Sequence, residues 1–471
     1  MDKRTHLMNL WLDTLDTPLS RRAGLTDDLD IDVAIVGGGF TGLWAAHFLR
    51  QAMPGAKVVV LEKEFVGFGA SGRNGGWASA LYPVAFDRLV TEVGEKRARN
   101  VREVWRRSVP ELGAELTRLG VDAGYSYGGN ITVARTKVQM KRVEEEFLAA
   151  TRAGEGAVRL SGEQLQERIN VKGALGGLYI RECARIHPAK AVRGLAAAVE
   201  RMGVQIFEES EVLSLRPGKS SVATKGIVKV RHRGIIHRVH ANLIVEATEG
   251  FLPSINSPAR SQRSVVPVYS LMTATEPLTS EMWSEIGWSG NETLAEASHL
   301  ITYAQRTSDG RIAIGGRGAP YFFNSKISPE QDRDAKVHGQ LRELARSWFP
   351  ILRDINFTHA WGGPLGIARD WHPTVSFNES SGYARAGGYV GDGVTSSYVA
   401  GRTLADLISG SESEFTQLPW VNHQSPQWEG EPVRWLAINA GLKAMTWADR
   451  EESLTRRESI IARTMAPLLG H

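Results

Sequence analysis

The chain has 471 residues, and its 56 lysine and arginine residues against 52 aspartate and glutamate residues leave a net charge of only +4. A chain of this length exceeds one compact core, so we expect two intertwined domains. No block of like charges supports nucleic-acid binding, and the single cysteine, Cys183, excludes an internal disulfide and a cysteine-based metal site. No apolar window is long enough to span a bilayer and the N-terminus lacks the apolar core of a signal peptide, so we expect a cytoplasmic protein without a metal site.

The N-terminal part alternates short apolar runs with helical periodicity. After a polar lead-in over residues 1–30, the sequence predicts a strand at Asp32–Val36, a helix at Phe40–Gln51 and a second strand at Lys57–Leu61. This order is typical of a βαβ unit, and a further helical pattern covers residues 86–119.

The rest of the chain predicts a mixed sheet with helices, followed by a return to parallel α/β structure. We expect helices at 137–153, 188–202, 329–347 and Ser396–Leu407, and two amphipathic helices in 430–471. The expected strands are 123–134, 204–216, 222–230, 236–247, 265–275, 299–306, 311–315 and 383–393.

These elements predict an α/β fold in which a Rossmann-type nucleotide-binding domain is assembled from discontinuous segments, with an inserted mixed-sheet (α+β) substrate domain. The nucleotide-binding segments are 31–120, 186–262 and 356–410. The substrate segments are 121–185 and 263–355, and a helical tail covers 411–471.

The strongest motif is a glycine turn between the first strand and the first helix, in DVAIVGGGFTGLWAAHFL. Gly37 permits the tight turn, Gly39 lets the backbone approach a pyrophosphate, and Gly42 allows close packing of helix on strand. The helix start at Phe40 and Thr41 then directs amide groups and a positive dipole end toward the phosphates.

Glu62 lies 20 residues after Gly42, at the end of the second strand, with Lys63 beside it. A carboxylate at this place accepts hydrogen bonds from ribose hydroxyl groups. Together with the glycine turn, it predicts a dinucleotide-binding site.

A second glycine-rich loop follows, and its Ser71 hydroxyl could bond a phosphate. On composition alone it could also be a flexible surface loop. The loop consists of Gly69, Ala70, Ser71, Gly72, Arg73, Asn74, Gly75 and Gly76.

The chain resembles the D-amino-acid oxidase superfamily of FAD-dependent oxidoreductases, which includes glycine oxidase and sarcosine oxidase. Four stretches carry the resemblance: GGGFTGL, GASGRNGG, NLIVEATEGF and GGYVGDGVTSSYVAGRTLADLI. The glycine-rich loop and the lead-in LWLDTLDTP look most like the gamma-glutamylputrescine oxidase branch.

The resemblance implies an FAD held along residues 37–76, with Val212 beside the adenine and with Ala247 and Thr248 near the pyrophosphate. The relatives that bind FAD covalently use an early histidine or a late cysteine. Here the loop after Gly69 has no histidine and the late segment has no cysteine, so we expect non-covalent FAD. The flavin edge would be faced by Gly391, Asp392, Gly393, Val394 and Thr395, which precede a helix whose dipole can stabilise the reduced flavin.

The reaction expected from this resemblance is hydride transfer from the carbon next to an amine nitrogen to the flavin, with O2 as the acceptor of the electrons and with release of H2O2. The expected catalytic residues are Asn74, Tyr303 and His372, and the expected substrate-binding residues are Arg73, Trp77, Tyr269, Arg317 and Trp361. We place Trp361 and His372 in a loop over the flavin, and Tyr303 on the same strand face as His299 and Gln305.

Each candidate has a structural alternative. Tyr303 and Trp361 could be core aromatic residues, Arg317 a salt-bridge partner and His372 a buried structural histidine. At the level of function, the alternatives are an amine dehydrogenase that passes electrons to a quinone or carrier, a nucleic-acid-binding flavoprotein, and a flavoprotein without turnover. The tail could pack on its own protein or lie on a membrane surface.

Overall fold

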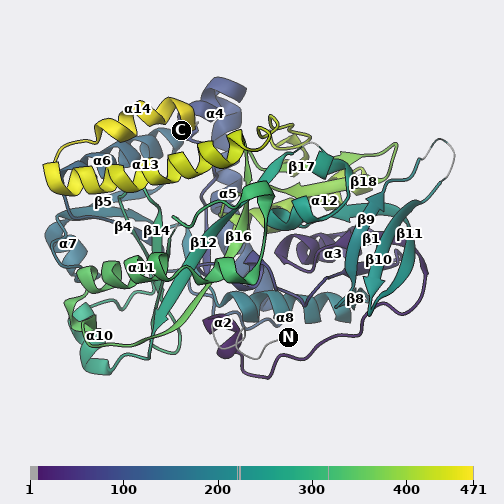
Figure 1. The fold of residues 1–471 in the computed structure, drawn as a ribbon, viewed down its shortest axis with the longest axis horizontal. Helices are drawn as coiled ribbons and strands as arrows, with labels where there is room; N and C mark the ends of the chain where they lie inside the picture. Colours follow the sequence, from purple (N-terminus) through teal and green to yellow (C-terminus); the bar gives the residue numbers. More distant parts are fainter. Residues whose placement is uncertain (1–8, 220, 222–223, 262, 317, 470–471) are drawn as a thin grey trace.

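The computed structural model describes residues 9–219, 221, 224–261, 263–316 and 318–469. The described strands form two eight-stranded sheets and a two-stranded ribbon, β3 (Trp77–Ser79) with β7 (Cys183–Arg185). Figure 1 shows the two large sheets in different halves of the molecule. The expected mixed α/β fold class is confirmed.

The first sheet is built around β1 (Leu29–Val36), which runs parallel to β11 (Ile235–Glu246) and β2 (Val58–Leu61). Alternate β1 side chains serve different cores: Val33 packs toward the helices, and Ala34 packs toward the antiparallel strands on the other face. Burial on both faces explains why residues 33–36 of the strand are a continuous apolar run. The order is β17 (Thr374–Asn378), β18 (Tyr383–Gly387), β11, β1, β2 and β8 (Gln205–Phe207), with β10 (Gly226–His232) and β9 (Glu211–Arg216) attached beside β11.

Helices α3 (Phe40–Ala52) and α12 (Gly393–Ser409) cover one face of this sheet and pack against each other. Gly401 allows the close approach, because a Cβ there would lie 2.6 Å from the Trp44 backbone. The contact holds the two glycine turns that precede these helices at the same edge of the sheet. Helices α4 (Phe86–Val93), α5 (Glu95–Arg118) and α8 (Pro188–Arg201) complete this half.

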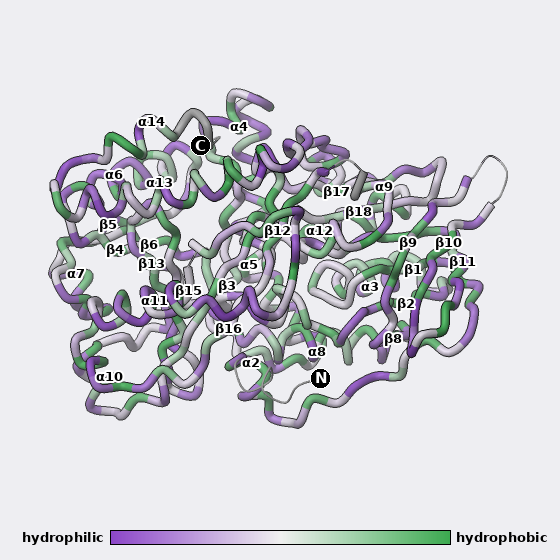
Figure 2. Tube along the Cα trace, viewed as in Figure 1, coloured by the Kyte–Doolittle hydropathy of each residue, from purple (hydrophilic) through white to green (hydrophobic). Residues whose placement is uncertain are grey.

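The second sheet joins strands that are far apart in the sequence, and its two longest members, β16 (Phe357–Ala368) and β12 (Val265–Thr275), form an antiparallel pair. Figure 2 shows mixed hydrophilic and hydrophobic segments around this pair, which lies between the two halves. The order is β16, β12, β15 (Ile312–Gly316), β14 (Thr302–Arg306), β13 (Thr293–Glu296), β4 (Asn130–Ala134), β6 (Gly176–Ile180) and β5 (Ala157–Ser161). The helices of this half are α6 (Lys137–Ala153), α7 (Gly162–Gln166), α10 (Ser280–Ile286) and α11 (Ala335–Trp348).

The expected loop around Trp361 is wrong, because β16 occupies residues 357–368. Three glycines and a proline weaken the local strand signal, yet pairing along the whole of β12 stabilises the extended backbone. By this pairing β16 lies in the second sheet, although we expect residues 356–410 in the nucleotide-binding domain.

Two further expectations differ in their bounds. The helical pattern over 86–119 is divided at Gly94, whose φ of 82° ends α4 before α5 begins. The strand expected at 123–134 is confined to β4, residues 130–134, and before it Ser126 makes an isolated bridge to Arg185 of β7.

The lead-in and the tail both contain helices that pack on the body of the protein. Near the start, α2 (Leu10–Asp13) buries Leu10 and Trp11. Elsewhere in the chain, a short helix, α9 (Pro258–Ser261), follows β11. The tail forms α13 (Val433–Thr455) and α14 (Ile460–Leu469), which Figure 1 shows along the outer edge of the second half. No helix in the described ranges has the length and apolar character needed to cross a bilayer.

Candidate active site

A cavity of about 660 Å³ runs from the carboxyl ends of β1 and β11 to the β12–β16 pair. Ligands of open α/β sheets bind outside the carboxyl ends of the strands, so this is the place where a nucleotide is expected. Most of the residues expected at the cofactor and substrate sites line it: Gly37, Gly39, Phe40, Thr41, Glu62, Lys63, Gly69, Ala70, Ser71, Arg73, Asn74, Val212, Ala247, Thr248, Tyr269, Gly391, Gly393 and Val394.

The three fingerprint glycines leave no room for a side chain. A Cβ at Gly37 would lie 2.4 Å from the carbonyl oxygen of Ala247, and the φ of +110° there also disfavours other residues. A Cβ at Gly42 would lie 2.1 Å from the carbonyl oxygen of Gly37, and one at Gly39 would lie 2.8 Å from Ser71 Oγ. The glycines therefore close the turn between β1 and α3 and bring the second glycine-rich loop onto it.

Ser71 connects the second loop to the start of α3. Its Oγ accepts a hydrogen bond from the Phe40 amide at 2.9 Å. The serine hydroxyl therefore lies where the first turn of α3 directs its unpaired amides, which is the usual place for a phosphate group.

The Glu62 carboxylate is held by backbone amides at the end of β2. It accepts hydrogen bonds from Gly38 N at 2.8 Å and from Glu64 N at 2.9 Å. Burial raises the pKa of Glu62 to about 7, although both backbone hydrogen bonds favour the ionised form. An acceptor fixed in this way can bind two ribose hydroxyl groups.

The second loop is fixed by side chains from distant parts of the chain. Trp361 Nε1 donates to the carbonyl oxygen of Arg73 at 2.9 Å, and Trp11 Nε1 donates to that of Asn74 at 2.9 Å. Gln305 Nε2 donates to the carbonyl oxygen of Gly75 at 2.7 Å. Three buried donors thus hold three successive carbonyl groups, which makes the loop a rigid wall of the cavity.

Asn74 lines the cavity, but its amide is used within its own loop. Nδ2 donates to the carbonyl oxygens of Ala70 and Ser71, and Oδ1 accepts from Gly76 N at 2.7 Å. Both amide hydrogens are therefore occupied, and the geometry favours a positioning role over the catalytic role that we expected.

Arg73 reaches the far end of the cavity and is paired there. Its NH1 lies 2.5 Å from Asp332 Oδ2 and donates to the carbonyl oxygen of Gly362 at 3.0 Å, while Nε donates to that of Phe68 at 2.7 Å. Burial raises the pKa of Asp332, and the Arg73 guanidinium opposes that rise. The Arg73 guanidinium, expected at the substrate site, is thus already bound by a carboxylate of the chain.

Several expected site residues lie away from the cavity, behind its walls. Tyr303 Oη is 2.7 Å from Ser270 Oγ, and its ring packs where Gly75 and Gly315 leave space. Trp361 is buried beneath the Arg73 loop and does not form a wall over a ligand. Others outside the lining are Gly42, Gly75, Gly76, Trp77 and Thr395. Arg317 lies outside the described residues.

His372 is also outside the lining, so the catalytic role that we expected lacks geometric support. Its Nε2 is 2.7 Å from Glu92 Oε2, and its ring lies 4.5 Å from the ring of His423. Burial lowers the pKa of His372, which is consistent with a structural histidine between β16 and β17.

Sequence reasoning missed Glu249, which lines the cavity opposite the glycine-rich loops. Its carboxylate accepts hydrogen bonds from the amides of Gly388 at 2.7 Å and Tyr389 at 3.2 Å, which connects β11 to the turn before α12. Burial raises the pKa of Glu249 to about 7. The sequence feature that could have identified Glu249 is its position directly after Thr248, one residue beyond the expected pyrophosphate contacts. Asp332 gave no comparable signal.

The residues around the nucleotide end fit the FAD that the sequence predicts. Thr248 Oγ1, in the lining, is buried and has no hydrogen-bond partner among the described residues. No side-chain hydrogen bond caps the first turn of α12. Buried polar groups without partners are costly, so these hydroxyl and amide groups are suited to a polar ligand. Cys183 is buried with its Sγ 3.3 Å from Thr293 Oγ1, and no cysteine or histidine lines the cavity.

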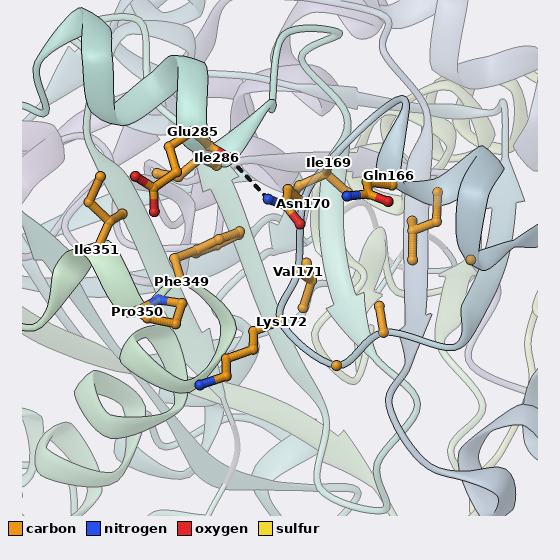
Figure 3. Close-up of a pocket in the computed structure, with 14 residues that line it drawn as sticks. Gln166, Ile169, Asn170, Val171, Lys172, Glu285, Ile286, Phe349, Pro350 and Ile351 are labelled. Atoms are coloured by element: carbon orange, nitrogen blue, oxygen red, sulfur yellow. Dashed lines mark hydrogen bonds between the residues drawn. The ribbon is translucent and has the colours of Figure 1, made fainter.

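A second hollow of about 450 Å³ lies at the far end of the second sheet. Figure 3 shows Lys172 and Glu285 on either side of Phe349, with the hydrogen bond from Asn170 N to the carbonyl oxygen of Ile286 beside them. None of the expected site residues lines this hollow, so it is separate from the nucleotide site.

One group of possible metal ligands occurs within the described ranges, formed by His299, Asp449 and Glu452. His299 Nε2 is 2.9 Å from Glu452 Oε1, and Arg142 NH2 contacts both side chains. Asp449 accepts hydrogen bonds from the amides of His299 and Leu300. Because a guanidinium already supplies the positive charge, this group is an ion-pair network that attaches α13 to the body.

Comparison with known proteins identifies the family to which the chain belongs. The family model described as "FAD dependent oxidoreductase" (DAO) matches residues 32–407. The chain is similar to gamma-glutamylputrescine oxidoreductase of Escherichia coli strain K12, with 27% identity over 400 residues that cover 85% of this chain and 88% of the relative. It is also 26% identical to the probable oxidoreductase OrdL of Haemophilus influenzae over 430 residues, 90% of this chain and 94% of the relative.

Among solved structures, glycine oxidase from Geobacillus kaustophilus has a similar fold, with a TM-score of 0.67 at 21% sequence identity. The alignment covers 84% of this chain and all of the other chain. The tail after residue 407 lies beyond the part that the family model matches.

Proposed function

Because the chain belongs to the family of FAD dependent oxidoreductases, we propose that it uses FAD to oxidise the C–N bond of an amine or amino acid to an imine. Two similar proteins are named for nitrogen-bearing compounds, gamma-glutamylputrescine and glycine. The observation that carries the proposal is that one cavity extends from the dinucleotide fingerprint to Tyr269 at the substrate end.

The proposed reaction removes a hydride from the carbon and a proton from the nitrogen, and water then hydrolyses the imine to a carbonyl compound and a free amine or ammonia. When bound, FAD supplies the two-electron acceptor, and O2 takes these two electrons with two protons to leave as H2O2. The chain supplies position and electrostatics, because an amine with a free lone pair assists its own C–H cleavage and needs no strong base.

At the nucleotide end, Glu62 is placed to bind ribose and the start of α3 to bind the pyrophosphate. Val212 and Thr248 line the same end. The uncapped first turn of α12 is placed to stabilise negative charge at the flavin edge. No covalent link to the chain is part of the proposal, so acid denaturation should release all of the FAD.

The substrate end favours an amine without a carboxylate next to the reacting carbon. The one arginine of the glycine-rich loop, Arg73, is bonded to Asp332, and Glu330 lines the same end. To reach Arg73, a substrate carboxylate would have to displace Asp332 and would meet the charge of Glu330, at a cost in desolvation and repulsion, and only Arg333 in the same lining would offset that cost. An uncharged amine nitrogen avoids both costs.

The test is an anaerobic screen of primary and secondary amines and amino acids that monitors bleaching of the bound flavin, followed by peroxide detection in air. We expect bleaching by one class of amine, with an aldehyde or ketone as product and H2O2 formed in equal amount. An enzyme loaded with FAD that no amine bleaches would overturn the proposed reaction.

A dehydrogenase with another electron acceptor is the second candidate. The one lysine among the lining residues is Lys63, at the nucleotide end, and β12 contains no lysine. No lysine ammonium is therefore available from these residues to attract reduced oxygen at the flavin. Bleaching by an amine without peroxide formation in air would favour this candidate.

A further inference from the structure

The tail helix α13 exposes a row of large apolar side chains. Leu436 is 56% exposed, Trp447 62% and Leu454 75%, and Val433 at the start of the helix is 57% exposed. Their spacing of 3, 11 and 7 residues places them along one side of an α-helix. Four large apolar side chains in one row differ from the scattered exposed residues that any surface has.

The opposite side of α13 is the one that packs on the protein. Gly441 and Ala448 are buried there, and the buried Arg434 and Glu452 make ion pairs with Glu431 and Arg142. The apolar row is therefore not the face that attaches the helix to the body. Figure 2 shows hydrophilic and hydrophobic stretches alternating along α13 and α14.

Unpaired cations accompany the apolar row. By helical geometry Lys443 and Arg450 lie beside Leu436 and Trp447, on the exposed side, and Arg456 and Arg457 follow at the end of the helix. None of these four side chains makes an ion pair with a described residue.

The acidic side chains of the same segment are all engaged. Glu452 bonds Arg142 and His299, and Glu458 bonds Lys141. Glu451 accepts the Ser459 hydroxyl at 2.5 Å, and Asp449 accepts two backbone amides. The acids thus serve to attach the tail. Glu451 has no cationic partner, but the four unpaired cations leave the exposed side with a net positive charge.

We propose that the exposed face of α13, from Val433 to Leu454, docks on the surface of an anionic phospholipid bilayer. Tryptophan and leucine side chains enter the boundary between headgroups and acyl chains, and the lysine and arginine side chains contact the phosphates. A second copy of the chain fits this face less well, because pairing two such helices would bring Lys443 and Arg450 of both copies together in a dry interface.

The experiment is flotation of the FAD-loaded protein with vesicles of phosphatidylcholine alone or mixed with phosphatidylglycerol, at low and high salt. We expect association only with the anionic vesicles, weakened by salt. Leu436→Ser combined with Trp447→Ser should weaken it by about tenfold or more. Lys443→Gln combined with Arg450→Gln should weaken it by about tenfold and remove much of the salt dependence.

The matched control is Ile235→Ser combined with Ile236→Ser, which changes two exposed apolar residues at the start of β11 and should leave the association unchanged. FAD content and thermal unfolding of each variant report whether it is folded. Failure of the wild-type protein to float with anionic vesicles would overturn the proposal. So would a concentration-dependent dimer that the two serine substitutions dissociate, since it would assign the face to a second copy. Neither outcome depends on which amine is oxidised.

Discussion

Arg73 NH1 and Asp332 Oδ2 lie 2.5 Å apart at the substrate end of the cavity, and both side chains are largely withdrawn from solvent, with 10% and 15% exposed. The pair joins the glycine-rich loop to the 3-10 helix Pro329–Arg333, two segments that are 259 residues apart. It therefore sets both the shape and the charge of the end that we assign to the substrate.

Asp332→Asn should leave the Arg73 guanidinium without its carboxylate. We expect the free energy of unfolding to fall by about 2 kcal/mol, because one partner of a mostly buried pair is removed. We also expect a small carboxylate such as acetate to bind more tightly and to perturb the flavin absorbance. Asp354→Asn, the same change at an exposed residue outside the cavity lining, is the control and should show neither effect.

Gly42→Ala should prevent formation of the nucleotide site. Its Cβ would lie 2.1 Å from a backbone oxygen that cannot move away without opening the turn between β1 and α3. We expect loss of bound FAD and a destabilisation of about 3 kcal/mol or more in urea unfolding. At Gly55, just beyond α3, a Cβ would meet nothing within 4 Å, so Gly55→Ala should stay within about 0.5 kcal/mol of the wild type. Equal effects of the two changes would contradict the role given to Gly42.

The stability of the FAD-free protein should depend on pH through Glu62 and Glu249. Burial raises both pKa values from 4.5 to about 7. The folded protein therefore keeps these protons at pH values where the unfolded chain has lost them. Its free energy of unfolding should fall as the pH rises from 4.5 to about 7, by about 1 kcal/mol for each partly exposed carboxyl group.

Urea unfolding of the FAD-free protein across this pH range measures the effect. Glu249→Gln and Glu62→Gln should each flatten the curve, because an amide keeps the shape of the side chain but does not titrate. Glu285→Gln, far from the cavity, should leave the curve as it is. A stability that rises with pH over this range, with no change in the Glu249→Gln variant, would contradict the burial of these groups.

The tail should influence substrate binding through Glu431. Its Oε1 accepts hydrogen bonds from Tyr321 Oη and from Asn324 N, both at 2.9 Å, at the base of the segment that runs on to Ser328 and the substrate end. Glu431→Gln should raise the KM of the amine several-fold with little change in kcat, since the segment loses a charge-assisted anchor and the flavin site is untouched.

Tyr321→Phe should reproduce the effect on KM, and hydrogen exchange should increase in residues 321–333. Glu429→Gln is the matched control, because Glu429 pairs with Arg369 on the surface. An equal fall in kcat and kcat/KM would instead indicate that the tail acts on the chemical step.

The nucleotide site could be read from the sequence because its determinants are local. Gly37, Gly39 and Gly42 belong to one turn between a strand and a helix. A continuous apolar run predicts the strand and the helical period predicts the helix, and Glu62 follows at the end of the next strand. The turn requires an unusual backbone conformation and close approach of neighbouring backbone atoms. Only glycine allows both, so glycines at a fixed spacing reveal the site.

The residues at the substrate end are determined by contacts between distant segments, which no local sequence pattern indicates. Asp332 meets Arg73, Trp361 holds the backbone of the glycine-rich loop, and Tyr303 and His372 turn away to Ser270 and Glu92. Because any aromatic or charged residue on a strand can face either side, only the pairing of β16 with β12 and the packing of the two halves determine which side chains reach the cavity.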